Sequence, residues 1–184
     1  MRIVLCLCLS LPVLASPPRD WRVFTSRPQT YLASREPGYQ GKYSASLAST
    51  VQANQSTYAL YVQDIDAARF RGCRIRLSGW LRTRLEGGWA GLWLRADPGK
   101  GPPLAFENMQ SNGLKGVQSW RRVQFEIDIP AQTQSLHYGA LINGLGQIWA
   151  DDLKLEVIAQ APPGLAEMRR LRILDEPSNL GFEQ

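Results

Sequence analysis

Tryptophan and arginine side chains alternate with aliphatic ones in the middle of the sequence, and this spacing suggests a binding surface. Between residues 73 and 82 every second residue is apolar or glycine, and Trp80 falls among the arginines between them. The alternation resumes after two glycines and places Trp93 and Arg95 on the non-aliphatic face. Aromatic faces pack on flat rings, and guanidinium groups donate hydrogen bonds. Such a surface suits a sugar or small polar ligand, whereas the alternative is that both tryptophans fill the core.

Asparagine and histidine side chains elsewhere in the chain extend the candidate surface. Their amide and ring nitrogens form hydrogen bonds with ligand hydroxyl groups. The predicted ligand-binding residues are Trp80, Trp93, Arg95, Asn108, His137 and Asn143.

The residues that catalysis would need are scarce. His137 is the single histidine of the chain, so a zinc hydrolase site is not expected. A G-x-S-x-G nucleophile motif is absent from the sequence. Glu107 with Asp151 or Asp152 is the pair of carboxylates that a glycosidase would use. We therefore predict a protein that is not an enzyme, with a carbohydrate-active hydrolase as a remote alternative.

The elements that must position these residues are strands. Alternating apolar residues recur in short runs separated by glycine and proline, which is typical of a two-sheet antiparallel β-sandwich. Gly87-Gly88 and Asn143-Gly144 each lie between two such runs, and we expect a hairpin turn at both places. A short helix over residues 165–174 and a returning strand at 179–183 are expected to follow. The predicted fold class is all-β.

The first fifteen residues have the pattern of a secretory signal. Arg2 precedes an apolar run, and small residues lead to a cleavage position after Ala15. Removing this segment removes Cys6 and Cys8 and leaves Cys73 as a lone, buried thiol. We predict a signal peptide at 1–15, a sandwich domain at 16–160, and a C-terminal helix and edge strand at 161–184. The predicted localisation is periplasmic or secreted.

Composition and charge are those of an ordinary globular domain. The chain has 184 residues, of which 20% are charged and 44% hydrophobic, and its net charge is +5. The arginines are spread along strands, without a basic run or a helix-turn-helix pattern, so nucleic acid is not an expected partner. No apolar stretch beyond the signal is long enough for a membrane span.

Several segments, taken together, resemble a bacterial family of β-sandwich domains with the galactose-binding-like jelly-roll fold, found alone or beside AraC-type DNA-binding domains. The matching residues are 39–47, 71–81, 91–95, 104–109, 116, 120, 138–146 and 148–153. The resemblance implies glycan recognition and, in many such modules, a structural calcium ion, for which Asp151 and Asp152 are the candidate ligands. No other cofactor is expected. Residues 177–182 resemble a segment that opens such sandwiches.

Two functions remain open at this point. The first is a secreted, non-catalytic module that binds a carbohydrate or small polar ligand on its tryptophan and arginine face. The second is an interaction or structural module of a periplasmic assembly, whose partner is another secreted protein. Transcriptional control is not expected, because no DNA-binding domain follows the sandwich.

Overall fold

Eight antiparallel β-strands make up the part of the chain that the computed structural model describes, which is residues 17, 20–41 and 43–160. The strands are β1 (Arg22–Thr25), β2 (Tyr31–Glu36), β3 (Ser44–Ser49), β4 (Tyr58–Asp66), β5 (Cys73–Asp97), β6 (Ala105–Glu107), β7 (Val117–Asp128) and β8 (Ser135–Gln160). These residues contain no helix, and so none that could cross a membrane.

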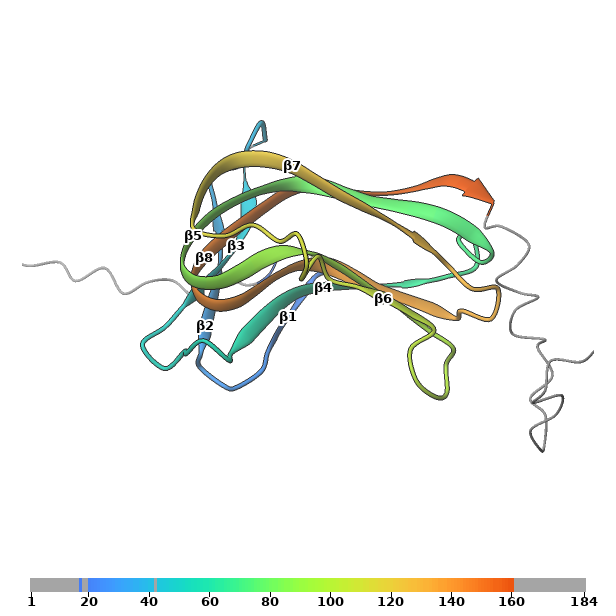
Figure 1. Cartoon of the computed structure of the whole chain (residues 1–184), viewed down its shortest axis with the longest axis horizontal. Helices are drawn as coiled ribbons and strands as arrows, with labels where there is room; N and C mark the ends of the chain where they lie inside the picture. Colours follow the sequence, from blue (N-terminus) through green and yellow to red (C-terminus); the bar gives the residue numbers. More distant parts are fainter. Residues whose placement is uncertain (1–16, 18–19, 42, 161–184) are drawn as a thin grey trace, which may run out of the picture.

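Two long strands, β5 and β8, each run through both layers of a sandwich. The first sheet has the order β1-β4-β8-β5-β6 and uses the start of β8 and the end of β5. The second sheet has the order β2-β3-β8-β5-β7 and uses the other half of each long strand. In Figure 1, β7 lies above β1, β4 and β6, and the long strands curve from one layer to the other at the left.

The bend of the long strands depends on glycine. Gly88 pairs with Gly144 where β5 and β8 leave one sheet for the other. Gly88 has a φ of 85°, and a Cβ atom there would lie 1.9 Å from the carbonyl oxygen of Asn143. The two predicted hairpins are therefore wrong, because β5 and β8 pair with each other instead of folding back on themselves. Glycine permits a turn and a sharp bend equally well, so the sequence does not separate the two.

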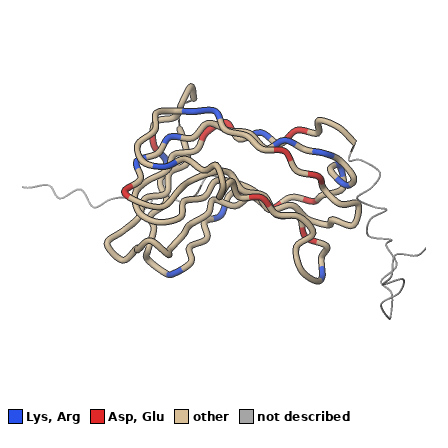
Figure 2. The backbone as a smooth tube through the Cα atoms, in the orientation of Figure 1, with Lys and Arg blue, Asp and Glu red and all other residues tan. Residues whose placement is uncertain are grey.

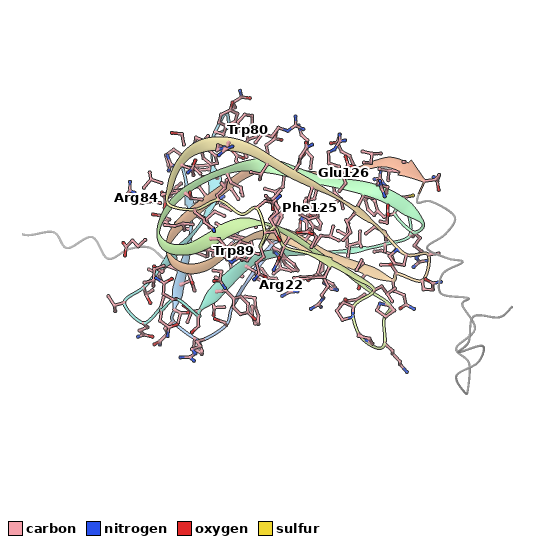
Figure 3. The ribbon with its side chains drawn as sticks, viewed as in Figure 1. Arg22, Trp80, Arg84, Trp89, Phe125 and Glu126 are labelled. Carbon is pink, nitrogen blue, oxygen red and sulfur yellow. The ribbon has the colours of Figure 1, made fainter. Side chains whose placement is uncertain are left out.

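The core lies between the two sheets. Leu92 and Leu94 of the first sheet and Leu77 of the second are fully buried, and Phe125 and Ile127 of β7 pack against them. Figure 3 shows Phe125 between the layers and Glu126, its neighbour, on the outer side. The alternation in the sequence thus predicts the inward face correctly, and the all-β sandwich is confirmed. Cys73 is buried and free, as expected.

One strand of the structure was not expected, and three expected segments fall outside the described residues. Strand β2 was not predicted, because its sequence, YLASRE, follows a proline-rich stretch and contains no β-branched residue. The signal peptide, the C-terminal helix and the returning strand lie outside the described residues, and they stay predictions.

Candidate functional site: a hollow on the outer face of the first sheet

A hollow of about 550 Å³ lies on the outer face of the first sheet. Strands β1, β4, β8 and β5 form its base, and β6 with the loop after it forms one wall. Its volume is in the range of small-ligand sites, about 300–1,000 Å³. Because successive residues of a strand face opposite sides, every second residue of these strands lines the hollow while its neighbours enter the core.

The floor of the hollow is apolar and closely packed. Trp93, Val62 and Leu141 form a small buried cluster there, with Leu60 and Trp89 packed against it. The indole Nε1 of Trp93 donates a hydrogen bond to the main-chain oxygen of Tyr61 at 3.1 Å. Trp93 is only 5% exposed, so it supports the floor from below more than it offers an open stacking face.

Three exposed aromatic rings stand around this floor. The exposed fractions are 43% for Phe24, 37% for Tyr58 and 56% for Phe106. The Phe24 and Tyr58 rings lie with their centroids 6.0 Å apart on one side, and Phe106 comes from β6 on the other. Large apolar side chains left in water on both sides of one hollow are typical of a binding site, because burying them against a ligand is favourable.

A chain of charged groups closes one end of the hollow. Asp64 accepts two hydrogen bonds from Arg22, at 2.7 and 2.9 Å, and lies 2.5 Å from Nδ1 of His137. Nε2 of His137 lies 3.2 Å from Asp97, and Asp97 also pairs with Arg95 at 2.7 Å. Figure 3 shows Arg22 on the outer side of the first sheet, where this chain begins.

The charges of this chain balance each other. The guanidinium of Arg22, through its hydrogen bonds, does most to lower the pKa of Asp64 to about 2, and His137 adds to the effect. Asp64 in turn raises the pKa of Arg22. Both arginines that line the hollow therefore face a carboxylate already. Such a polar end offers donors and acceptors together, which suits hydroxyl groups better than an anion.

The hydroxyl group of Ser135 also lies close to His137 at this end of the hollow. Its oxygen is 3.1 Å from Nε2 of the imidazole, a distance that a serine nucleophile and its base would show. The same nitrogen, however, also faces the carboxylate of Asp97 at 3.2 Å. Nε2 accepts a hydrogen bond from Ser135 in one tautomer of His137 and donates to Asp97 in the other.

Amide side chains complete the lining of the hollow at the end away from His137. Asn143 pairs across the sheet with Trp89 and Tyr58. Asn108 and Gln110 come from the loop after β6, where the side chain of Asn108 accepts a hydrogen bond from the main-chain nitrogen of Gln110 at 3.0 Å.

The structure brings five of the six predicted ligand residues to this hollow: Trp93, Arg95, Asn108, His137 and Asn143. Trp80 is elsewhere, on the outer face of the second sheet, where its ring stacks on Tyr39 at 3.8 Å. The prediction that Trp80 and Trp93 share one surface is wrong, because the bend at Gly88 carries the two halves of β5 into opposite layers. Figure 3 shows Trp80 and Trp89 on different layers.

The lining residues that were not predicted include the cation Arg22 and the exposed rings of Phe24, Tyr58 and Phe106. A signal for one of them exists, since Tyr58, Leu60 and Val62 alternate with buried Ala59 and Tyr61. That β4 lies two strands away from β5 could not be predicted without the topology.

Asp151 and Asp152 do not form a metal centre in the described residues. Asp151 accepts hydrogen bonds from the main-chain nitrogens of Tyr39 and Asp152, both at 2.8 Å, and Asp152 pairs with Lys154 at 3.2 Å. No cluster of three or more His, Cys, Asp or Glu side chains suited to a metal occurs in this part of the chain. Two carboxylates that are already bonded fall short of the six to eight oxygens that calcium takes. The calcium site stays a prediction without structural support.

The fold is similar to that of carbohydrate-binding modules. The chain matches the CBM22-1 xylan-binding domain of Paenibacillus barcinonensis Xyn10C with a TM-score of 0.54 at 12% identity, over 80% of this chain and 92% of that domain. It also matches the enzymatically active domain of bacteriophage CBA120 tailspike protein 4 with a TM-score of 0.59 at 11% identity, over 76% of this chain and 20% of that one. Identities this low establish the fold and nothing about the ligand.

A relative in sequence points to a class of protein. The chain is 32% identical over 150 residues to the HTH-type transcriptional regulator YbfP of Bacillus subtilis (strain 168), which is 82% of this chain and 51% of the regulator. The chain thus spans about half the length of this relative. No protein-family model matches it. The expected resemblance to sandwich domains that occur beside DNA-binding domains is confirmed.

This match corrects the predicted function and localisation. The prediction of a secreted or periplasmic binding module is wrong, because the matching protein is an HTH-type transcriptional regulator. The exclusion of transcriptional control and of nucleic acid partners loses its basis for the same reason. The predicted localisation was based on the apolar start of the chain, and the resemblance to domains that occur beside DNA-binding domains was not used for it.

Proposed function

We propose that the sandwich is the ligand-sensing domain of a helix-turn-helix type transcriptional regulator system, and that its ligand binds in the hollow of the first sheet. A helix-turn-helix motif is helical, whereas the described residues form strands only. A match over 82% of the chain must include most of these strands. We therefore infer that the sandwich corresponds to a part of the regulator other than its helix-turn-helix motif.

The observation that carries the proposal is the composition of the hollow. It joins an apolar floor, three exposed aromatic rings and a polar end in one concave surface. Sites for small molecules combine a mostly apolar lining with a few placed polar groups in this way. A ligand here buries the exposed rings and exchanges water for amide and charged hydrogen-bonding groups.

The class of ligand follows from the balance of charges. Arg22 and Arg95 are each paired with a carboxylate, so a phosphate or carboxylate ligand would have to compete with an aspartate for either guanidinium. Hydroxyl groups donate and accept together and fit between such pairs. We therefore infer a neutral, polyhydroxylated small molecule, such as a mono- or oligosaccharide, as the signal that the domain senses.

Calorimetric titration of the full chain with a panel of neutral saccharides and their phosphorylated counterparts tests this assignment. We expect binding of a neutral member, and a loss of about tenfold or more for Phe106→Ala, because that ring is exposed and contributes to ligand contact and not to the core. Leu32→Ala is the matched control, since Leu32 is a comparably exposed apolar residue on β2, in the second sheet.

Preference for the phosphorylated compounds, or equal losses in the two variants, would contradict the assignment. If the folded wild-type protein bound none of the saccharides, sugars would be excluded as the ligand class.

A further inference from the structure

The outer face of the second sheet carries arginines and tryptophans that the hollow does not use. We define the arginine face as Arg82, Arg84 and Arg122 with Trp80, Trp120 and Trp149. Trp80 pairs with Arg122 of β7 in the sheet register, and Arg82 pairs with Trp149 of β8. Figure 3 shows Trp80 on the upper side of the molecule and Arg84 at the bend, both away from Arg22 and the hollow.

Arg82 is held in place by aromatic rings. Its guanidinium carbon lies 4.0 Å from the centre of the Trp149 ring and 5.4 Å from that of Trp120. Its Nε is buried and has no hydrogen-bond partner in the described residues. Trp149 itself is fixed, because its indole nitrogen donates to Glu36 at 2.7 Å. Stacking therefore orients this cation, and no acidic side chain among the described residues forms an ion pair with it.

The cations of this face differ from those further along the same two strands. At the other end of β5 and β7, Arg74 pairs with Asp128 and Arg76 with Glu126, each at 2.7 Å. Arg82, Arg84 and Arg122 form no ion pair with a described residue. Figure 2 shows basic and acidic positions along the upper layer, to which both groups of arginines belong.

Unpaired cations gathered on one side of a domain attract a polyanion, because no intramolecular carboxylate has to be displaced. Arg82 and Arg84 lie two residues apart on one strand, about 7 Å along it, and Arg122 extends the row onto the next strand. A double helix carries a phosphate about every 3.4 Å per strand along its axis, so the spacing of the two arginines corresponds to about every second phosphate. The matching protein is an HTH-type transcriptional regulator, so duplex DNA is the polyanion that a domain of such a protein would meet.

We propose that the arginine face contacts the sugar-phosphate backbone of duplex DNA, without reading its sequence. The sandwich would then increase the affinity of a regulator for DNA and help to orient it on the duplex. Recognition of the bases would be the role of another part of the regulator. This proposal goes beyond ligand sensing and uses a different sheet, so it can fail while the hollow still binds its ligand. It rests on the same relationship to a regulator.

Fluorescence anisotropy with a labelled 30-base-pair duplex of random sequence tests the proposal on the full chain, between 50 and 200 mM NaCl. Three phosphate contacts predict a slope of about −2.7 for log K against log salt, at about 0.9 per contact. The double variant Arg84→Gln/Arg122→Gln should bind more weakly and flatten the slope by about 1.8. The matched control is Arg74→Gln/Arg76→Gln, which removes the same charge from the same face of β5.

Each other result overturns the proposal. If the wild type does not bind the duplex at 50 mM NaCl, a DNA contact is excluded. If the two double variants weaken DNA binding equally, the loss is due to the lower net charge and not to the arginine face. Poly-aspartate that binds as tightly as DNA, with the same dependence on Arg84 and Arg122, makes an acidic protein the partner. Circular dichroism and urea unfolding show whether the variants remain folded.

Discussion

Among single residues, Trp93 has two roles that an alanine scan would confuse. It forms the floor of the hollow, and it is also a buried side chain whose indole nitrogen bonds the main chain of β4. Loss of ligand binding on its removal would therefore not identify it as a ligand contact. The exposed ring of Phe106 and the amide of Asn143 are the cleaner probes of contact with a ligand.

We expect Trp93→Ala to lower the free energy of unfolding by about 3–5 kcal/mol, because it leaves a cavity beside Val62 and Leu141. Urea denaturation followed by circular dichroism measures the change. Phe106→Ala is the control and should cost less than about 1 kcal/mol, since its ring is exposed. Equal stability of the Trp93 variant and the wild type would show that the floor is not packed as described.

Asp64 links the polar end of the hollow to acid stability. Its pKa falls from 3.8 to about 2 in the folded protein, chiefly because Arg22 bonds its charged form. A carboxyl with a depressed pKa stabilises the fold fully above its unfolded value, and this stabilisation disappears as the pH falls through its folded value. Protonation of Asp64 would also weaken its bonds to Arg22 and His137 and so alter the hollow.

The difference in unfolding free energy between wild type and Asp64→Asn should be full at pH 5.5 and narrow steadily below pH 4 toward pH 2. Urea titrations at a series of pH values measure it. Asp20→Asn, an exposed aspartate without an ion pair among the described residues, is the control and should show no such trend. A constant difference for the Asp64 variant across this range would contradict the depressed pKa.

At the level of elements, the two long strands decide the architecture. β5 and β8 pair along their whole length and carry the chain from one sheet to the other at the glycines. The alternation of apolar residues predicted the strands and their inward faces, because burial imposes a period of two. It did not predict the continuity of each strand through Gly88 and Gly144, because glycine is found at hairpin turns and at bends alike.

Gly88→Ala should lower the free energy of unfolding by at least about 2 kcal/mol, since a side chain is strained at its positive φ and meets the carbonyl of Asn143. Gly101→Ala is the matched control. Gly101 also has a positive φ but lies in open space, so only the smaller backbone penalty of about 1 kcal/mol applies. Thermal or urea unfolding compares the two, and equal losses would mean that the bend imposes no special restriction.

For the whole molecule, the sequence predicted several residues of the candidate site but not how the fold brings them together. Arg95, His137 and Asn143 were found from their types and parity, and the register places them together on β5 and β8. Phe24 and Tyr58 arrive from β1 and β4, whose position beside β8 depends on the order of strands in the sheet. Local pattern does not contain that order, because it reflects contacts between residues far apart in sequence.

The two outer faces of the molecule differ in charge, and we expect them to bind different partners. The hollow on the first sheet is neutral in charge balance and lined by aromatic rings, whereas the outer face of the second sheet carries unpaired arginines. A domain built this way can bind a small ligand and a polyanion at once, since the two surfaces lie on opposite layers.

The six tryptophans of the chain provide the most direct test of where a ligand binds. In fluorine NMR of the chain labelled with 5-fluorotryptophan, single Trp→Phe variants assign the six signals before a neutral saccharide that binds is added. The account predicts that the signals of Trp89 and Trp93 shift while those of Trp80, Trp120 and Trp149 stay in place. Shifts confined to the second group would place the ligand on the opposite sheet and contradict the account.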